Sequence, residues 1–149
     1  MQKLLAAFQQ FYRENADVWV EGFTYKEAGP QLLLQAFLQR IINGGGLINR
    51  EYGLGRRRTD IFIEWPLDES QGIHGPLQRI IIEIKLRRGE ASETIIALGL
   101  EQTADYSRRA GADESHLIII DCTPRKTWDE KIWKREECFE AMPITVWGA

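Results

Sequence analysis

Hydrophobic and polar residues alternate most regularly along two stretches in the middle of the chain. The first stretch, DIFIEW at residues 60–65, alternates two sets of side chains, as a pleated strand with two distinct faces requires. The second stretch, IIIEIKL at residues 80–86, has the same period of two. That period places Glu83 and Lys85 on one face of a strand and their aliphatic neighbours on the other.

The segment between these two strands predicts how they pair. Residues 66–78, PLDESQGIHGPLQ, are rich in Pro, Gly and polar residues, which indicates an antiparallel hairpin closed by a long loop. A roughly symmetric loop puts Asp60 opposite about residue 84, and so beside Glu83 and Lys85. The prediction depends on register, because a shift of one residue turns one strand's side chains to the opposite face.

Helical periodicity predicts three helices before the last third of the chain. Residues 2–15 space their apolar side chains as an amphipathic helix that packs on the domain or on a partner. Pro30 near the start and Asn43-Gly44 at the end bound a second helix. Ser92 and Gly111 suit the N-cap and C-cap of a third helix of nearly twenty residues.

The third predicted helix carries two polar candidates. Its sheet-facing stripe is predicted to contain Ile95, Leu98, Gln102 and Tyr106. A Gln on such a stripe needs a hydrogen-bonding partner, which can be a functional group or a purely structural one. The helix therefore brings Gln102 and Tyr106 toward the sheet, with their function left open.

The remaining segments predict further strands and one more helix. Residues 47–55, LINREYGLG, indicate a first strand and turn, and residues 115–121 indicate a strand buried on both faces and paired in parallel. His116 is expected to cap that strand. Residues 127–140, TWDEKIWKREECFE, are interpreted as an amphipathic helix, and residues 144–147 as a short final strand.

Composition narrows the class of protein. The chain has 149 residues, of which 44% are hydrophobic, enough for one globular domain with a core. Its net charge of −3 gives no overall basic signature, so any nucleic-acid site must be local. Cys122 and Cys138 lack disulfide or zinc spacing, and the chain lacks a signal peptide or a long apolar run, which favours a cytoplasmic location without membrane contact.

The two predicted strands bring together side chains suited to a divalent cation. Mg²⁺ prefers carboxylate oxygens and keeps several waters, so Asp60, Glu83 and a backbone carbonyl suffice to hold it against a phosphate. Lys85 could then orient an attacking water or stabilise negative charge on the phosphate. The alternative is an ordinary exposed Glu–Lys ion pair, which contributes little.

The order of these elements resembles the PD-(D/E)XK nuclease superfamily. A helix and a Gly-rich turn precede Asp60, then Glu83-Ile84-Lys85 follows, and residues 102–106, QTADY, resemble the QxxxY element of the RecB-like branch. Thr59 stands where the motif has Pro. The resemblance implies an α/β fold with a restriction-endonuclease-like core in the order αβββαβ, a mixed central sheet flanked by helices. It also implies metal-dependent hydrolysis of phosphodiester bonds.

The resemblance assigns roles to the matching residues. Asp60 and Glu83, with the Ile84 carbonyl, are expected to bind Mg²⁺ or Mn²⁺, and Lys85 to assist hydrolysis, while Gln102 and Tyr106 complete the catalytic set. Glu27, near the first core helix, is a candidate extra acid or a plain solvated residue.

Basic residues near the motif are expected to contact nucleic-acid phosphates. These candidates are Arg56, Arg57, Arg58, Arg87 and Arg88. Residues 50–109 contain ten Lys or Arg and ten Asp or Glu, so a basic patch forms only if folding separates the signs.

Residues 25–149 also resemble the C-terminal domain of prokaryotic proteins that carry an AAA-like ATPase domain. The resemblance implies two partners, nucleic acid, with DNA expected, and an ATPase domain in a longer protein. Residues 1–20 are then an N-terminal helical segment, a candidate linker to the ATPase, and residues 21–149 the nuclease-like domain. The alternatives are a catalytically inactive nucleic-acid-binding or protein-docking domain and a structural oligomerisation module. The oligomeric state stays open.

Overall fold

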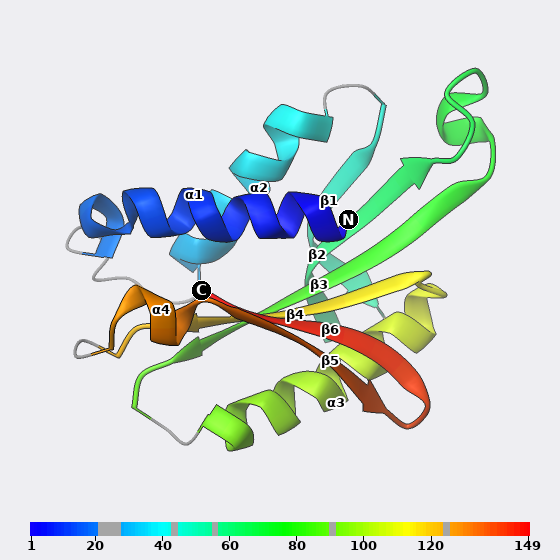
Figure 1. The fold of residues 1–149 in the computed structure, drawn as a ribbon. Helices are drawn as coiled ribbons and strands as arrows, with labels where there is room; N and C mark the ends of the chain where they lie inside the picture. The colour runs from blue at the N-terminus through cyan, green and yellow to red at the C-terminus, as the bar shows by residue number, and fades with distance from the viewer. Residues whose placement is uncertain (21–27, 43–44, 55–56, 90–91, 124–125) are drawn as a thin grey trace.

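The computed structural model describes residues 1–20, 28–42, 45–54, 57–89, 92–123 and 126–149. The elements follow the order α1 (Gln2–Val20), α2 (Ala28–Ile42), β1 (Leu47–Leu54), β2 (Arg57–Pro66), η1 (Gly72–His74), β3 (Leu77–Arg87), α3 (Ser92–Ala110), β4 (Glu114–Asp121), α4 (Trp128–Lys131), β5 (Trp133–Phe139) and β6 (Met142–Gly148). They form a six-stranded mixed sheet flanked by helices, so the predicted α/β class is confirmed (Figure 1). In the described part of the chain, no helix combines the length and the apolar character needed to cross a bilayer.

The strands lie in the order β1-β2-β3-β4-β6-β5. The first three strands pair antiparallel, β4 lies parallel to both β3 and β6, and β5 pairs antiparallel with β6. Helix α3 makes the crossover between β3 and β4, which parallel neighbours require. The predicted parallel pairing of residues 115–121 is therefore confirmed.

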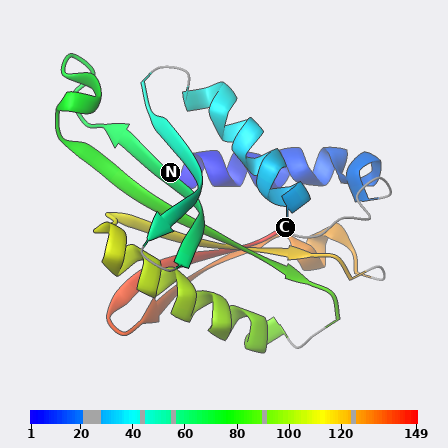
Figure 2. The same ribbon diagram turned by 180° about the vertical axis from the view of Figure 1, so that it is seen from behind.

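Helices cover both faces of the sheet (Figure 1, and from behind in Figure 2). On one face, α1 and α2 pack on the sheet through a cluster that contains Leu5, Phe8, Leu34, Leu38, Ile61, Ile63, Ile82 and Ile118. On the other face, α3 packs through a cluster that contains Ile96, Leu100, Ala104, Leu117, Ile119 and Val146. Each such fully buried large aliphatic side chain stabilises the fold by about 1.5–3 kcal/mol. Helix α1 therefore shares a core with the sheet.

The β2–β3 hairpin has the register on which the site depends. The ladder runs from Pro66–Leu77 at the loop to Ile61–Ile82 at the open end. One step beyond that last pair brings Asp60 level with Glu83. The antiparallel hairpin predicted from the alternating pattern is thus confirmed.

The prediction of a helix over residues 127–140 is wrong. Only Trp128–Lys131 is helical, and Trp133–Phe139 forms the edge strand β5, which pairs with β6 along its whole length. Side chains at the odd positions of WKREECF are half-buried and those at the even positions are exposed, which is the period of a strand. The apolar face formed by Trp128, Ile132 and Trp133, on which the helix prediction depended, was a weaker signal than this alternation.

The predicted stripe of α3 is rotated relative to the observed one. Leu98 is 56% exposed, whereas Ile96, Gly99 and Thr103 are buried. A Cβ at Gly99 would lie 2.6 Å from the Leu117 side chain, so this glycine lets α3 approach β4 closely. Tyr106 remains on the buried side, and Gln102 lies at its margin.

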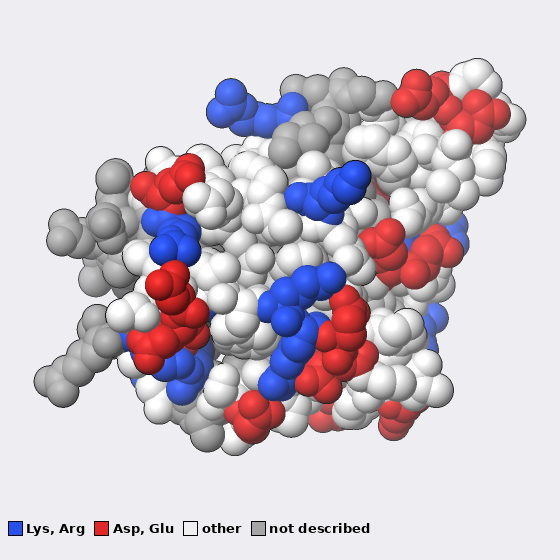
Figure 3. Space-filling model, in the orientation of Figure 1, with Lys and Arg blue, Asp and Glu red and all other residues white. Residues whose placement is uncertain are grey.

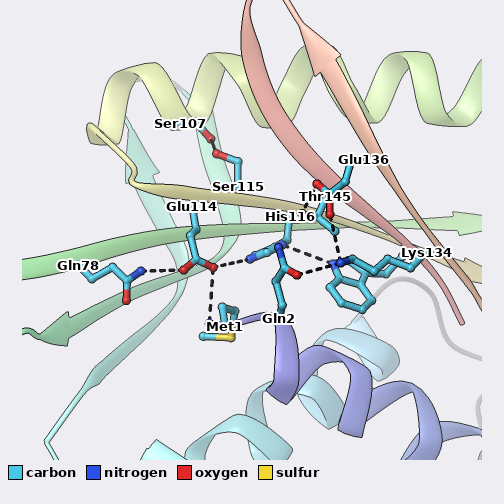
Figure 4. A network of polar contacts seen from close by, with 11 residues as sticks. Met1, Gln2, Gln78, Ser107, Glu114, Ser115, His116, Lys134, Glu136 and Thr145 are labelled. Carbon is cyan, nitrogen blue, oxygen red and sulfur yellow. Dashed lines mark hydrogen bonds and ion pairs between the residues drawn. The ribbon is translucent and has the colours of Figure 1, made fainter.

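The prediction that His116 merely caps a strand is also wrong. His116 is 1% exposed within β4, and the Trp147 indole N–H donates to its Nδ1 at 3.4 Å (Figure 4). Because an indole can only donate, Nδ1 accepts and the proton sits on Nε2, which donates to Glu114 at 3.2 Å. Glu114 also accepts from Gln78. The network satisfies buried polar groups on the face covered by α1.

Candidate metal centre

Asp60 lies where β2 and β3 separate. Its Oδ2 accepts a hydrogen bond from the backbone N–H of Ile84 at 2.8 Å. The side-chain amide of Gln31, from the first turn of α2, donates to the Asp60 carbonyl at 3.1 Å and to Oδ1 at 3.4 Å. The carboxylate is therefore oriented from two sides, by the neighbouring strand and by a helix.

Glu83 and Lys85 lie on the α3 face of β3, as the sequence predicted. The Lys85 ammonium is 2.8 Å from Glu83 Oε1. Glu83 is only 3% exposed, and its second oxygen, Oε2, is buried without a hydrogen-bond partner among the described residues. A buried carboxylate oxygen without a hydrogen-bond partner is costly, because that oxygen has lost its hydration.

The protonation of Glu83 reflects this environment. Burial raises its pKa and the nearby Asp60 charge raises it further, whereas Lys85 and the backbone N–H of Asp60 lower it in part, and the resulting pKa is about 7. The group is thus poised between protonated and ionised forms near neutral pH. A cation placed between the two acids would favour the ionised form.

Tyr106 and Gln102 extend the site onto α3. Tyr106 is 6% exposed and packs with Phe62 and Ile81, on the same sheet face as Glu83. Moving four residues back along the helix covers about 6 Å, and moving two residues forward along the strand covers about 6.6 Å. Gln102, one turn before Tyr106, is therefore displaced from Ile81 toward the Glu83 end of β3.

The amide of Gln102 does not point into solvent. Its Oε1 is buried and has no hydrogen-bond partner within the described ranges. Glu83 Oε2 and Gln102 Oε1 are thus two buried oxygens without a hydrogen-bond partner, one on β3 and one on the helix that packs on the same sheet face.

The donor set fits a hard divalent cation with few protein ligands. Asp60 and Glu83 supply two carboxylates, and among the described residues no group of three or more His, Cys, Asp or Glu side chains forms a larger cluster. Mg²⁺ commonly binds through one or two carboxylates while it keeps several waters. Glu27, the candidate extra acid, lies outside the described residues, and nothing tests the Ile84 carbonyl as a ligand.

The predicted phosphate-binding arginines are only partly described. Arg56 lies outside the described residues, and of Arg57 and Arg58 only the backbone in β2 is described. Arg88 is exposed, whereas the Arg87 guanidinium is largely buried and donates to Asp121 at 2.8 Å. On the face shown in Figure 3, acidic and basic described side chains lie next to one another without a field of one sign.

The sequence reasoning missed Gln31. This residue is 6% exposed and lies on the same helical stripe as the buried Leu34 and Leu38. The signal was the spacing of these three residues at i, i+3 and i+7, which places the polar Gln31 on an otherwise apolar stripe. A polar residue on such a stripe needs a hydrogen-bonding partner inside the protein. Its partner here is Asp60.

Comparisons of the chain with protein-family models, with curated proteins and with solved structures found no match.

Proposed function

We propose that this chain is a metal-dependent nuclease of the PD-(D/E)XK type that hydrolyses phosphodiester bonds of nucleic acid, with DNA as the expected substrate. The observation that carries the proposal is the buried Glu83 carboxylate, with one oxygen on Lys85 and the other without a partner, next to Asp60. In a simple structural ion pair, both oxygens of the buried carboxylate would be expected to have hydrogen-bond partners. An acid left half-satisfied beside a second acid instead favours a cation as the missing partner.

The order of elements supports a restriction-endonuclease-like core. Helix α2, the antiparallel strands β1, β2 and β3, helix α3 and the parallel strand β4 follow the αβββαβ order that the resemblance implies. Asp60 lies on the middle strand of the antiparallel set, and Glu83 and Lys85 lie on the next strand.

The residues have distinct roles in this proposal. Asp60 and Glu83 would hold Mg²⁺ or Mn²⁺, and the ion, when bound, supplies Lewis-acid polarisation of the phosphate and a lowered pKa for the attacking water. Lys85, fixed by its contact with Glu83, orients that water or stabilises the charge that develops on the phosphate. The buried Gln102 Oε1 is an acceptor for a donor group at the bound substrate.

A docking role without cleavage is the second candidate. Only two acids meet in the described part of the chain, so a site that binds nucleic acid or protein without turnover is the alternative. In either case we propose that the chain acts with an AAA-like ATPase domain, a partner that rests only on the resemblance of residues 25–149.

A cleavage assay tests the proposal. Labelled duplex DNA, single-stranded DNA and RNA are incubated with Mg²⁺, with Mn²⁺ or with EDTA, and wild type is compared with Asp60→Ala. We expect metal-dependent cleavage that falls at least about 100-fold in Asp60→Ala, in line with loss of an essential group. Asp129→Ala, which removes an exposed acid on α4 paired with Arg13, is the matched control and should cleave normally.

The failure modes of this assay are distinct. Tight binding of nucleic acid by wild type without cleavage under any metal condition favours the docking candidate. Cleavage that survives Asp60→Ala, or the absence of both binding and cleavage, overturns the proposed nuclease.

A further inference from the structure

A second charged cluster lies beyond the metal centre, at the carboxyl end of β4. Asp121 is 7% exposed, and its Oδ2 is 2.8 Å from Arg87 Nη1 and 2.8 Å from Lys126 Nζ. Its Oδ1 accepts from the backbone N–H of Thr123 at 3.0 Å. Burial opposes ionisation of Asp121, but hydrogen bonds from Lys126 and Thr123 and the charge of Arg87 outweigh it and lower the pKa to about 2.

The charged cluster lies along the same strand, β3, as the candidate metal centre. Glu83, Lys85 and Arg87 alternate along β3 and so project from one face, and Arg87 pairs with Asp121 across the β3–β4 ladder. Arg87 therefore lies about 6.6 Å beyond Lys85 along the strand. That distance is comparable to the length of one nucleotide in an extended strand.

The two cations are close enough to share one anion. Each nitrogen is 2.8 Å from the same oxygen, so the two nitrogens cannot be more than twice that distance apart. A phosphate group, whose oxygens diverge from one centre, can accept hydrogen bonds from both.

The charge of the cluster is unbalanced. One carboxylate faces two cations, so Arg87, Lys126 and Asp121 together carry a net charge of +1. The Glu130 carboxylate, whose Oε2 accepts from the backbone N–H and hydroxyl of Thr127, adds one negative charge near Lys126. Arg88 and Lys131 add two positive charges near Cys122, the residue after Asp121, so the wider cluster keeps an excess of positive charge. A partly buried group with excess positive charge favours an anionic partner.

We infer that Arg87 and Lys126, positioned by Asp121, form a phosphate subsite for the nucleic-acid strand whose neighbouring phosphodiester bond lies at Asp60, Glu83 and Lys85. This inference rests on the proposed function and adds a contact between the protein and the neighbouring phosphate of the nucleic-acid strand. Lys126 is the more accessible of the two cations, with its side chain 29% exposed against 15% for Arg87. Binding at this subsite should depend on the phosphate charge and not on the base sequence, because phosphate contacts position a strand without specifying its bases.

Binding at different salt concentrations tests the subsite. A fluorescein-labelled DNA duplex is titrated in EDTA, which prevents cleavage, between about 50 and 200 mM salt. For Lys126→Ala we expect weaker binding and a slope of log K against log salt that is smaller by about 0.9, the loss of one phosphate contact. In the cleavage assay KM should rise and kcat should stay unchanged, because the subsite does not touch the reacting atoms.

Two further variants separate a charge effect from a structural one. Lys126→Arg keeps the charge and should restore the salt slope, which a lysine with a purely structural role would not require. Lys134→Ala removes an exposed lysine on β5 that contacts Glu136 and should change neither slope nor KM.

The outcomes distinguish this inference from the proposed function. If wild type cleaves in a manner that depends on Asp60 but Lys126→Ala keeps the wild-type slope and affinity, the subsite is wrong and the nuclease stands. If wild type neither binds nor cleaves nucleic acid, both fall together.

Discussion

The Asp60 carboxylate accepts the backbone N–H of Ile84 at 2.8 Å, one step beyond the point where the β2–β3 ladder ends at Ile61–Ile82. The Asp60 side chain thus takes the place of a backbone acceptor from β2 at the point where β3 is no longer paired with β2. This arrangement holds a charged group at the fork of two strands, level with Glu83. It also means that Asp60 has a structural role separate from any metal.

Replacement of Asp60 can separate these two roles. Asp60→Asn keeps an acceptor oxygen and removes the charge, so we expect lost Mn²⁺ binding by calorimetry. In urea unfolding without metal the variant should be as stable as wild type or more stable, because repulsion with Glu83 is gone. Asp60→Ala leaves the Ile84 N–H unsatisfied and should be less stable by about 1–3 kcal/mol. Normal Mn²⁺ binding by Asp60→Asn would show that the metal centre is misassigned.

Glu83 should make the stability of the metal-free protein depend on pH. Its pKa rises from the ordinary value of 4.5 to about 7 in the folded state, so the folded state binds more protons than the unfolded state between these values. Stability therefore falls as pH rises through that window, by on the order of 3 kcal/mol if the whole shift is realised. Denaturant unfolding at pH 5 and pH 8 should show this fall in wild type.

Glu83→Gln is the matched variant, since it keeps the shape and cannot ionise. Its stability should be nearly constant over the same window. Glu114 and Asp121 have lowered pKa values of about 2, so their contributions are lost only at acidic pH and do not overlap with this range. A wild-type fall that persists in Glu83→Gln would assign the titration to another group.

In the proposed function the Lys85 ammonium assists the transition state and does not coordinate the ion, so Lys85→Ala should keep the metal and lose turnover. Lys85 lowers the pKa of Glu83, so its removal raises that pKa further. We therefore expect Mn²⁺ affinity to weaken modestly near pH 7 and to recover at higher pH, while cleavage stays low at both. Near wild-type cleavage would make Lys85 an ordinary ion-pair partner.

Local sequence pattern was sufficient to predict the central part of the site. The alternation in DIFIEW and IIIEIKL determines which side chains share a face, and the Gly- and Pro-rich loop between them makes the strands antiparallel neighbours. Asp60 and Glu83 meet because both signals are local and agree. The bounds of α3, Ser92–Ala110, agree with the helix predicted between Ser92 and Gly111.

Contacts between distant segments were not predictable in this way. Gln31 reaches Asp60 across 29 residues, and Arg87 reaches Asp121 across 34. Local periodicity carries no information about such pairs, since they depend on how α2 packs and on the register between β3 and β4. The strand β5 was missed for a related reason, because its pairing with β6 decides its conformation.

Gln31 should act on metal affinity through Asp60. Gln31→Leu preserves packing beside Leu34 but removes the amide that donates to the Asp60 carbonyl and carboxylate. Groups that orient metal ligands typically change affinity or activity by about 10–100-fold, and we expect a loss near the lower end. Calorimetry with Mn²⁺ measures it. Gln39→Leu, at an exposed position of the same helix, should bind Mn²⁺ like wild type, and an equal loss in both variants would indicate a general effect on α2.

Gln102 offers a test that separates substrate contact from metal binding. Its Oε1 is buried without a partner, so Gln102→Leu removes an unsatisfied polar atom and should leave the free energy of unfolding unchanged or raise it slightly. If that oxygen contacts substrate, cleavage falls by about 10–100-fold while Mn²⁺ affinity stays the same. Gln10→Leu, at an exposed glutamine of α1, is the control and should leave cleavage unaltered. Wild-type cleavage by Gln102→Leu would mean that the oxygen has no partner in the substrate, and a parallel loss of Mn²⁺ binding would place Gln102 among the groups that hold the metal.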